Sequence, residues 1–159
     1  MEKNIWVFLR LSIGFIFFWA FLDKTFGLGI STPPDKAWLV GASPTYGFLQ
    51  FGASGPFQPL WQALAGNILV DWLFMLGLFG VGLAFLLGIA MRAAAVAGAL
   101  MMFLIYLAVL WPEHNPMIDE HVIYALVLLG IGFSDLGREF SLSKWWQNTW
   151  LVKKFNWLK

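Results

Sequence analysis

Four long apolar segments dominate this chain of 159 residues, running from about residue 4 to 26, 67 to 90, 93 to 111 and 117 to 136. About 20 apolar residues in a helix cross a bilayer core that is about 30 Å thick. Lipid offers no hydrogen-bond partners to the backbone, so a spanning segment must be helical or part of a closed barrel. Because the apolar runs are continuous rather than alternating, helices are favoured. The sequence predicts an all-α membrane protein, an antiparallel bundle of four transmembrane helices in a single domain over residues 1–159.

Composition and charge indicate the orientation of this bundle. Hydrophobic residues make up 60% of the chain and charged residues 12%, against roughly 25% charged residues in soluble domains. With the N-terminus in the cytoplasm, only Lys24 and Lys36 of the 10 basic residues fall outside. Because Lys and Arg are enriched on the cytoplasmic side, we expect a multi-pass protein of the plasma membrane with both termini inside. The expected inner basic residues are Lys3, Arg10, Arg92, Arg138, Lys144, Lys153, Lys154 and Lys159.

Two segments outside the spans are rich in aromatic residues. The connection over residues 27–66 is long for a compact protein, and such loops are usually functional or folded over something. We expect it to form a cap on the outer surface, with short helices. The tail over residues 141–159 interleaves Trp with Lys at helical spacing. It predicts an amphipathic helix on the inner surface of the lipid bilayer, either as a plain anchor or in contact with anionic lipid.

Small residues at helical spacing predict close helix packing. Gly80, Ala84 and Gly88 follow one another every four residues, as do Ala94 and Gly98. Such seams let membrane helices approach closely, within one bundle or between subunits. We therefore expect these residues to face protein, and a homo-oligomer is an open alternative.

Ionisable residues near the outer ends of the spans are the first functional candidates, because isolated charges there are costly. A histidine beside a carboxylate can exchange protons near neutral pH, and an ammonium can hold an anionic or carbonyl group. Asp119, His121 and Lys24 are therefore the candidate catalytic residues. Since Asp119 and His121 are two residues apart, they cannot both point at the same neighbour unless the helix begins between them. The candidate substrate-binding residues, expected in the same outer cavity, are Asp23, Lys24, Asn67, Asp71, His114 and Asn115.

Each of these residues also has a simpler interpretation. Asp and Asn at helix starts cap free N–H groups, and a lysine near a helix C-terminus interacts favourably with the helix dipole. At the inner end, Arg10, Arg92 and Asp135 form a candidate ion cluster. Arg10 lies inside the first span, where it could reach the surface with its long side chain or pair with Asp135. Three basic residues near one carboxylate, counting Arg138, would also suit an anion.

Several kinds of chemistry are excluded for this chain alone. The absence of cysteine excludes disulfides, thiolate metal sites and persulfide chemistry. The 2 histidines both fall on the outer side and cannot ligate haem across the bundle, and no Cys or His spacing suits a zinc or iron–sulfur site. A redox role would need a borrowed cofactor or a diffusible quinone as co-substrate, since no cofactor site is encoded. A nucleic-acid partner is not indicated, because the basic residues lie at the membrane surface.

Several short elements lie along the chain: Arg10-Leu11-Ser12-Ile13-Gly14, the Phe18–Lys24 run, Ser43-Pro44-Thr45 with Gly55-Pro56-Phe57, Asp71-Trp72-Leu73, and Asn115-Pro116-Met117-Ile118-Asp119-Glu120-His121. Together they resemble the DoxX/DoxD family of small integral membrane proteins. The resemblance implies a four-helix membrane bundle. It also implies the large subunit of a thiosulfate:quinone oxidoreductase, which couples two thiosulfates into tetrathionate and reduces quinone beside a small subunit or redox partner. Other relatives are associated with redox-protection complexes or with maturation of secreted enzymes. The alternative is therefore a non-catalytic scaffold, assembly factor or small-molecule binder.

The predicted orientation can be tested with reporter fusions. A reporter placed after Lys159 or at Arg92 should report the cytoplasm, whereas a reporter at Ser54 should report the outside. The expectation follows from the unequal distribution of basic residues. A cytoplasmic signal from Ser54 would overturn the orientation.

Overall fold

The structure is a computed structural model that describes residues 2–112, 115 and 117–158. Its longest helices are α1 (Glu2–Phe26), α3 (Ile68–Leu87), α4 (Met91–Ala108) and α5 (Glu120–Phe133), and the described part of the chain contains no strand. By length and composition, α1, α3 and α4 could each cross a membrane. The all-helical prediction is confirmed, together with three candidate membrane-spanning helices.

The last predicted span is longer than the helix that forms there. We expected a helix over residues 117–136, whereas α5 has 14 residues and is shorter than the three candidate spans. It begins late because Asp119, in extended conformation, caps its first turn, and it ends where Ser134 returns to extended backbone. Local polar side chains thus set both ends of α5, inside the apolar run.

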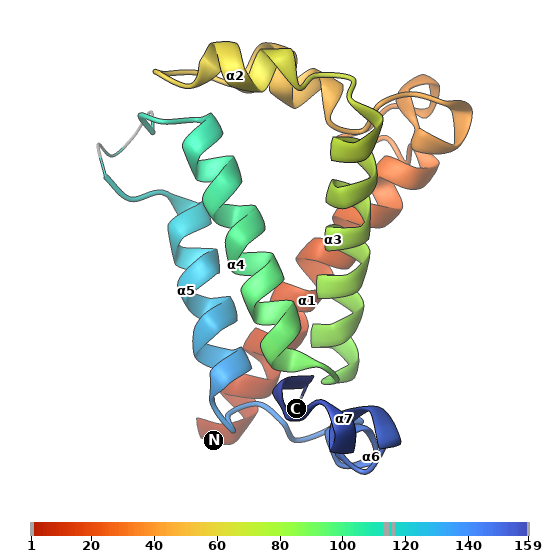
Figure 1. Ribbon diagram of the computed structural model, residues 1–159, viewed down its shortest axis with the longest axis vertical. Helices are drawn as coiled ribbons and strands as arrows, with labels where there is room; N and C mark the ends of the chain where they lie inside the picture. Colours follow the sequence, from red (N-terminus) through yellow and green to blue (C-terminus); the bar gives the residue numbers. More distant parts are fainter. Residues whose placement is uncertain (1, 113–114, 116, 159) are drawn as a thin grey trace.

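The four long helices form two pairs (Figure 1). Helix α1 packs along α3, and α4 packs along α5, while the short turn between α3 and α4 joins the two pairs. Figure 1 shows that the pairs come together near the N-terminus and the α3–α4 turn and diverge toward the opposite end. We call the end where the helix pairs come together the base end. The opposite end, where residues 27–66 lie, is the cap end.

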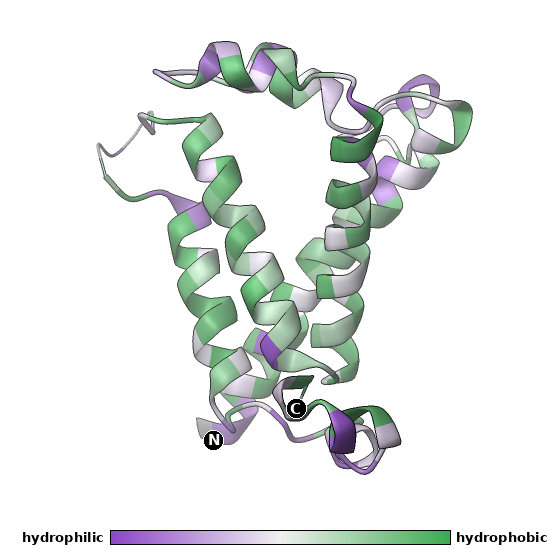
Figure 2. Ribbon diagram, in the orientation of Figure 1, coloured by the Kyte–Doolittle hydropathy of each residue, from purple (hydrophilic) through white to green (hydrophobic). Residues whose placement is uncertain are grey.

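Hydrophobic side chains fill the region where the two pairs meet. Met75 and Phe85 of α3 and Leu128 of α5 are fully buried there. In Figure 2 the four long helices are largely hydrophobic, and hydrophilic residues gather toward the cap end and the base end. This distribution is the one expected of helices whose middle parts face hydrocarbon.

Glycines allow the close approach within each pair. A Cβ atom built on Gly82 of α3 would lie 2.5 Å from the backbone nitrogen of Phe18 in α1. On α5, a Cβ atom on Gly132 would lie 2.2 Å from the Cβ of Ala95 in α4. Both distances are too short for any side chain, so each pair packs backbone against backbone at these points.

The predicted seams are correct on α4 and only in part on α3. Ala94 and Gly98 are buried, and Gly98 lies between α3 and α5. On α3, Ala84 is buried, but Gly80 is exposed and faces open space. The reason is that α1 covers the face that carries Gly82, which leaves the Gly80 face free. Gly88 is buried as the C-cap of α3, with φ of 70°.

The cap over residues 27–66 consists of short helical turns (Figure 1). Its elements are η1 (Pro34–Lys36), η2 (Trp38–Val40), the π-helical η3 (Phe48–Gly52) and α2 (Gln58–Ala63). At the far side of the cap, the backbone N–H of Ser54 donates to the carbonyl of Ala108 (2.8 Å), and the indole N–H of Trp61 donates to that of Leu107 (3.3 Å). The cap therefore bridges from α1 and α3 to the end of α4.

The tail after α5 folds beneath the base end. It consists of α6 (Ser143–Gln147), α7 (Trp150–Lys154) and η4 (Asn156–Leu158). Figure 1 shows these short elements beside the base ends of the long helices, with α6 and α7 set to one side.

Replacing glycines on α3 tests this packing. Gly82→Ala should lower the thermal stability of the detergent-solubilised protein, because the new methyl group would overlap the backbone of α1. Overpacking of this kind costs about 1–3 kcal/mol. Gly80→Ala, on the same helix but in open space, should leave the melting temperature unchanged or raise it, since alanine favours helix over glycine. Equal melting temperatures for the two variants would show that α1 does not pack on the Gly82 face.

Candidate functional site

Two buried carboxylates hold the cap in place. Asp71, at the start of α3, accepts hydrogen bonds from the hydroxyl of Ser43 (2.8 Å) and from the hydroxyl and backbone N–H of Thr45 (2.5 and 3.3 Å). Asp23, near the end of α1, accepts bonds from the backbone N–H groups of Ile30 and Ser31 (3.2 Å each) and from the Ser31 hydroxyl (2.7 Å). Both carboxylates thus bind the cap rather than a shared cavity.

Asp119 and His121 bind each other at the start of α5. The Asp119 Oδ2 atom lies 2.7 Å from Nδ1 of His121, and Oδ1 accepts hydrogen bonds from the backbone N–H groups of His121 and Val122. The helix begins at Glu120, between the two residues, so the ring folds back onto the carboxylate. Only 8% of the Asp119 side chain and 21% of the His121 side chain are exposed. Asp119 is therefore both a helix cap and the partner of an imidazole.

The imidazole lies on the inward face of α5. His121 is seven residues before Leu128, so the two share a helix face, and Leu128 is fully buried against α4 near Gly98. His121 lies on this same face at the cap end of α5, where the two helix pairs are farther apart.

Lys24 lies on the other helix pair. Its Nζ atom is 5.9 Å from the ring centroid of Phe74. Phe74 is three residues before Gly77, and a Cβ atom on Gly77 would lie 3.0 Å from the sulfur of Met101 in α4. Phe74 therefore shares the α3 face that turns toward α4. Among the described residues, no hydrogen bond or ion pair joins Lys24 to Asp119 or His121.

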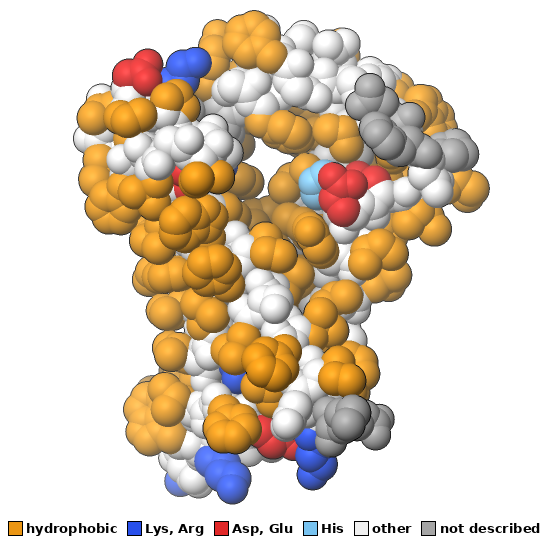
Figure 3. Space-filling model, turned by 180° about the vertical axis from the view of Figure 1, so that it is seen from behind, with side chains coloured by type: hydrophobic (Ala, Val, Ile, Leu, Met, Phe, Trp, Pro, Cys, Tyr) orange, Lys and Arg blue, Asp and Glu red, His pale blue; other side chains and the backbone are white. Residues whose placement is uncertain are grey.

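A hollow lies beneath the cap between the two helix pairs. Figure 3 shows it from behind, with hydrophobic side chains around it and an acidic and histidine patch on its border. That patch is the cluster of Asp119, Glu120 and His121, whose ligand atoms lie within 4.8 Å of one another. The arrangement places a carboxylate–imidazole pair on the border of the hollow, with the Lys24 ammonium carried by the opposite pair of helices.

The remaining predicted outer residues form local structure. Asn67 is the exposed N-cap of α3 and accepts hydrogen bonds from the N–H groups of Leu69 (2.9 Å) and Val70 (3.4 Å). Asn115 is exposed, and its side-chain oxygen accepts a bond from the N–H of Met117 (3.0 Å). The capping interpretation is therefore shown for Asn67, whereas Asn115 stabilises a local turn before α5 and caps no helix. His114 lies outside the described residues.

The expected pairing of Arg10 is wrong. Arg10 is fully buried, so it does not reach the surface. Its guanidinium donates to the carbonyl oxygens of Phe85 (2.5 Å) and Leu86 (3.0 Å) at the end of α3, of Gly137 (2.8 Å) and of Phe140 (3.2 Å). Helix C-termini carry partial negative charge, which is why this cation needs no carboxylate.

The other members of the predicted inner cluster are also separate from Arg10. The side chain of Asp135 is 96% exposed and pairs with Arg138 at 3.4 Å. Arg92 is half-buried in the first turn of α4, where its Nε atom has no hydrogen-bond partner in the described part of the chain. The base end therefore holds a structural arginine rather than an anion site around one carboxylate.

Some partners were not predicted from the sequence. Ser43 and Thr45 flank Pro44 in a segment whose turn residues indicated a loop, and nothing marked them as ligands of Asp71. The carbonyl partners of Arg10 belong to residues of every chemical type and leave no pattern in the sequence. Beside Arg10, two glycines have a positive φ, Gly88 with 70° and Gly137 with 72°.

Comparison with protein-family models, curated proteins and solved structures finds no match for this chain.

Substitution of Arg10 tests its structural role. Arg10→Leu should lower the free energy of unfolding by about 3 kcal/mol or more, because carbonyl groups of two segments lose their donor and each buried acceptor left unsatisfied costs about 1–3 kcal/mol. Lys3→Gln is the control, since it removes only an exposed ion pair with Glu139 and should have little effect. Melting curves in detergent would measure both. Similar curves for the wild type and Arg10→Leu would contradict the account.

Proposed function

We propose that the protein is a multi-pass plasma-membrane protein in which α1, α3, α4 and α5 form an antiparallel transmembrane bundle with both termini in the cytoplasm. The charge distribution supports this orientation, because Lys3, Arg92 and Lys144 all belong to the base end. At about 1.5 Å per residue, α5 alone is shorter than the hydrocarbon core, so flanking residues complete its passage. The cap then lies on the outer surface.

We propose further that the hollow beneath the cap binds a quinone, and that the protein is a DoxX/DoxD-like subunit of a quinone-linked oxidoreductase. The observation that carries this proposal is the Asp119–His121 pair, at 2.7 Å, on the inward face of α5. A quinone has an apolar tail that partitions into lipid and ring oxygens that need hydrogen-bonding groups. Apolar walls with a few convergent polar groups are typical of small-molecule sites.

The pair would exchange protons with the quinone ring. In the tautomer in which Nδ1–H of His121 donates to Asp119, the second ring nitrogen would accept a proton from a quinol hydroxyl or, once protonated, donate it to a quinone oxygen. Reduction of a quinone to a quinol consumes two electrons and two protons. A partner subunit would supply the electrons, for example by forming the S–S bond of tetrathionate from two thiosulfate ions. Lys24 would hold an anionic or carbonyl oxygen.

A non-catalytic scaffold, assembly factor or small-molecule binder is the second candidate. The observation that favours it is that Asp23 and Asp71 are occupied by the cap and serve its structure. Thiosulfate-dependent reduction of a quinone analogue by membranes that contain the protein and its partner would separate the two candidates.

Quinone affinity of matched variants tests the site. His121→Gln and Asp119→Asn should each weaken binding of a short-chain quinone by roughly tenfold, which corresponds to about 1.4 kcal/mol. Asn retains the capping ability of Asp119, so this variant removes the charge and spares the helix. Glu120→Gln, at the exposed neighbour, should bind like the wild type. Equal affinities in all four proteins, measured by equilibrium dialysis in detergent, would refute the proposed site.

A further inference from the structure

The tail beneath the base end is a fixed part of the molecule. The backbone N–H of Leu142 donates to the carbonyl of Leu87 at the end of α3 (2.8 Å). The indole N–H of Trp146 donates to the carbonyl of Leu158 (2.7 Å), and Val152 is only 1% exposed. These contacts fix which side chains of the tail point outward.

Large aromatic side chains are exposed along this tail. The exposed fractions are 62% for Trp145, 70% for Trp150 and 60% for Trp157. Phe140, just before α6, is 88% exposed although its backbone has φ of 52°, a conformation that side chains other than glycine rarely adopt. Its carbonyl accepts a hydrogen bond from the buried Arg10. The Phe140 side chain is therefore kept exposed at the base end even though its backbone conformation is strained.

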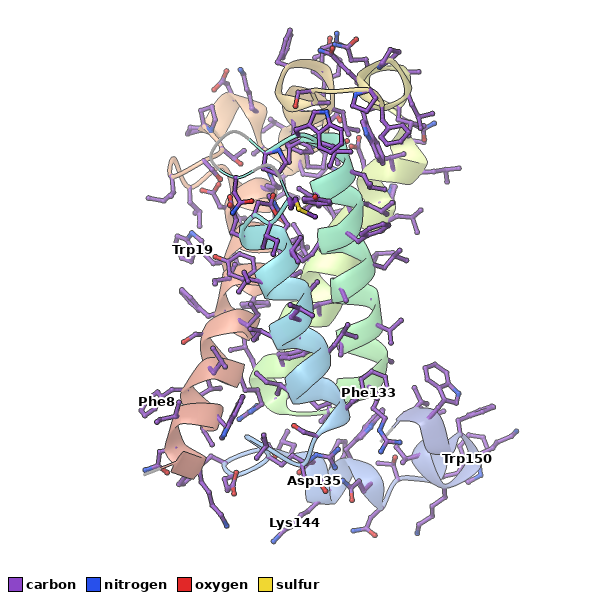
Figure 4. The ribbon with its side chains drawn as sticks, turned by 90° about the vertical axis from the view of Figure 1, so that its left-hand side faces the viewer. Phe8, Trp19, Phe133, Asp135, Lys144 and Trp150 are labelled. Carbon is purple, nitrogen blue, oxygen red and sulfur yellow. The ribbon has the colours of Figure 1, made fainter. Side chains whose placement is uncertain are left out.

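The charges of the tail have a single sign. Residues 141–159 contain four lysines and no acidic residue. Lys144, Lys153 and Lys154 are exposed, and the Nζ atom of Lys154 lies 5.0 Å from the ring centroid of Trp150. Figure 4 shows Lys144 and Trp150 on the part of the tail that lies below and to the side of the long helices. Glu139, the last acid before the tail, lies 3.8 Å from Lys3, and among the described residues no ion pair joins Lys144, Lys153 or Lys154 to an acid.

We propose that the surface formed by the exposed side chains of residues 140–158 binds the headgroups of anionic phospholipids. Tryptophan rings are stable at headgroup level, where one edge contacts apolar chains and the other contacts water. The lysines then reach the phosphate groups of a negatively charged leaflet, which attracts basic segments beside a membrane span. An acidic protein surface would match the charge but not the exposed tryptophans, whereas a lipid surface matches both.

The test uses the full chain in detergent and measures its melting temperature against added lipid. Phosphatidylglycerol should stabilise the protein at concentrations at least about tenfold lower than phosphatidylcholine does. The triple variant Lys144→Gln, Lys153→Gln and Lys154→Gln should lose this preference, and the corresponding triple change to Arg should keep it. Lys36→Gln, an exposed lysine in the cap, is the matched control and should behave like the wild type.

Three outcomes would overturn the proposal. The first is equal stabilisation of the wild type by the two lipids, and the second is a preference for phosphatidylglycerol that survives in the glutamine variant. The third is stabilisation by soluble glycerol phosphate equal to that by phosphatidylglycerol, which would indicate a site for free phosphate. Light scattering without lipid tests whether the tail binds a second copy of the chain instead. A dimer that depends on the tail lysines, together with no headgroup preference, would show that the partner of this surface is protein and not lipid.

Discussion

The structure depends on one buried guanidinium. Arg10 binds carbonyl groups at the end of α3 and in the segment after α5, and it lies itself in α1. Because burying a cation is costly unless its hydrogen bonds are made, these segments are held together as a unit. The base end is thereby closed, and the tail is fixed beneath it. Since α3 and α4 are joined by a short turn at the same end, both helix pairs are tied there.

The open arrangement of the helix pairs at the cap end follows from their being joined at the base end. With the pairs tied at the base and diverging above it, the space between their inward faces is bridged by the cap rather than filled by helix packing. Asp71 anchors the cap on one side, and the carbonyls of Leu107 and Ala108 anchor it on the other. The Asp119–His121 pair lies where this space is open. The closed base and the bridged cap end together leave a hollow beneath the cap, with the Asp119–His121 pair on its border.

The sequence predicted the parts of this structure that depend on composition and spacing. Long apolar runs indicated the helices. The spacing of Asp119 and His121 indicated that they could point at one neighbour only if a helix began between them, and α5 does begin there. Features that depend on backbone partners were missed. Arg10 was expected to bind a carboxylate, because carbonyl acceptors have no sequence signature. Gly80 and Gly82 look alike in sequence, and only the position of α1 decides which one is buried.

If the hollow beneath the cap is a ligand site, a photoreactive ligand should label the residues that face it. A quinone that carries a photoreactive group on its ring would be irradiated with the protein in lipid nanodiscs, and the labelled residues identified by mass spectrometry. We expect labels on the inward faces, at Phe74, Met101 or Tyr124, and their loss in the presence of excess unlabelled quinone. Labels confined to outward residues such as Leu100 and Phe103, which are exposed on α4, would contradict it.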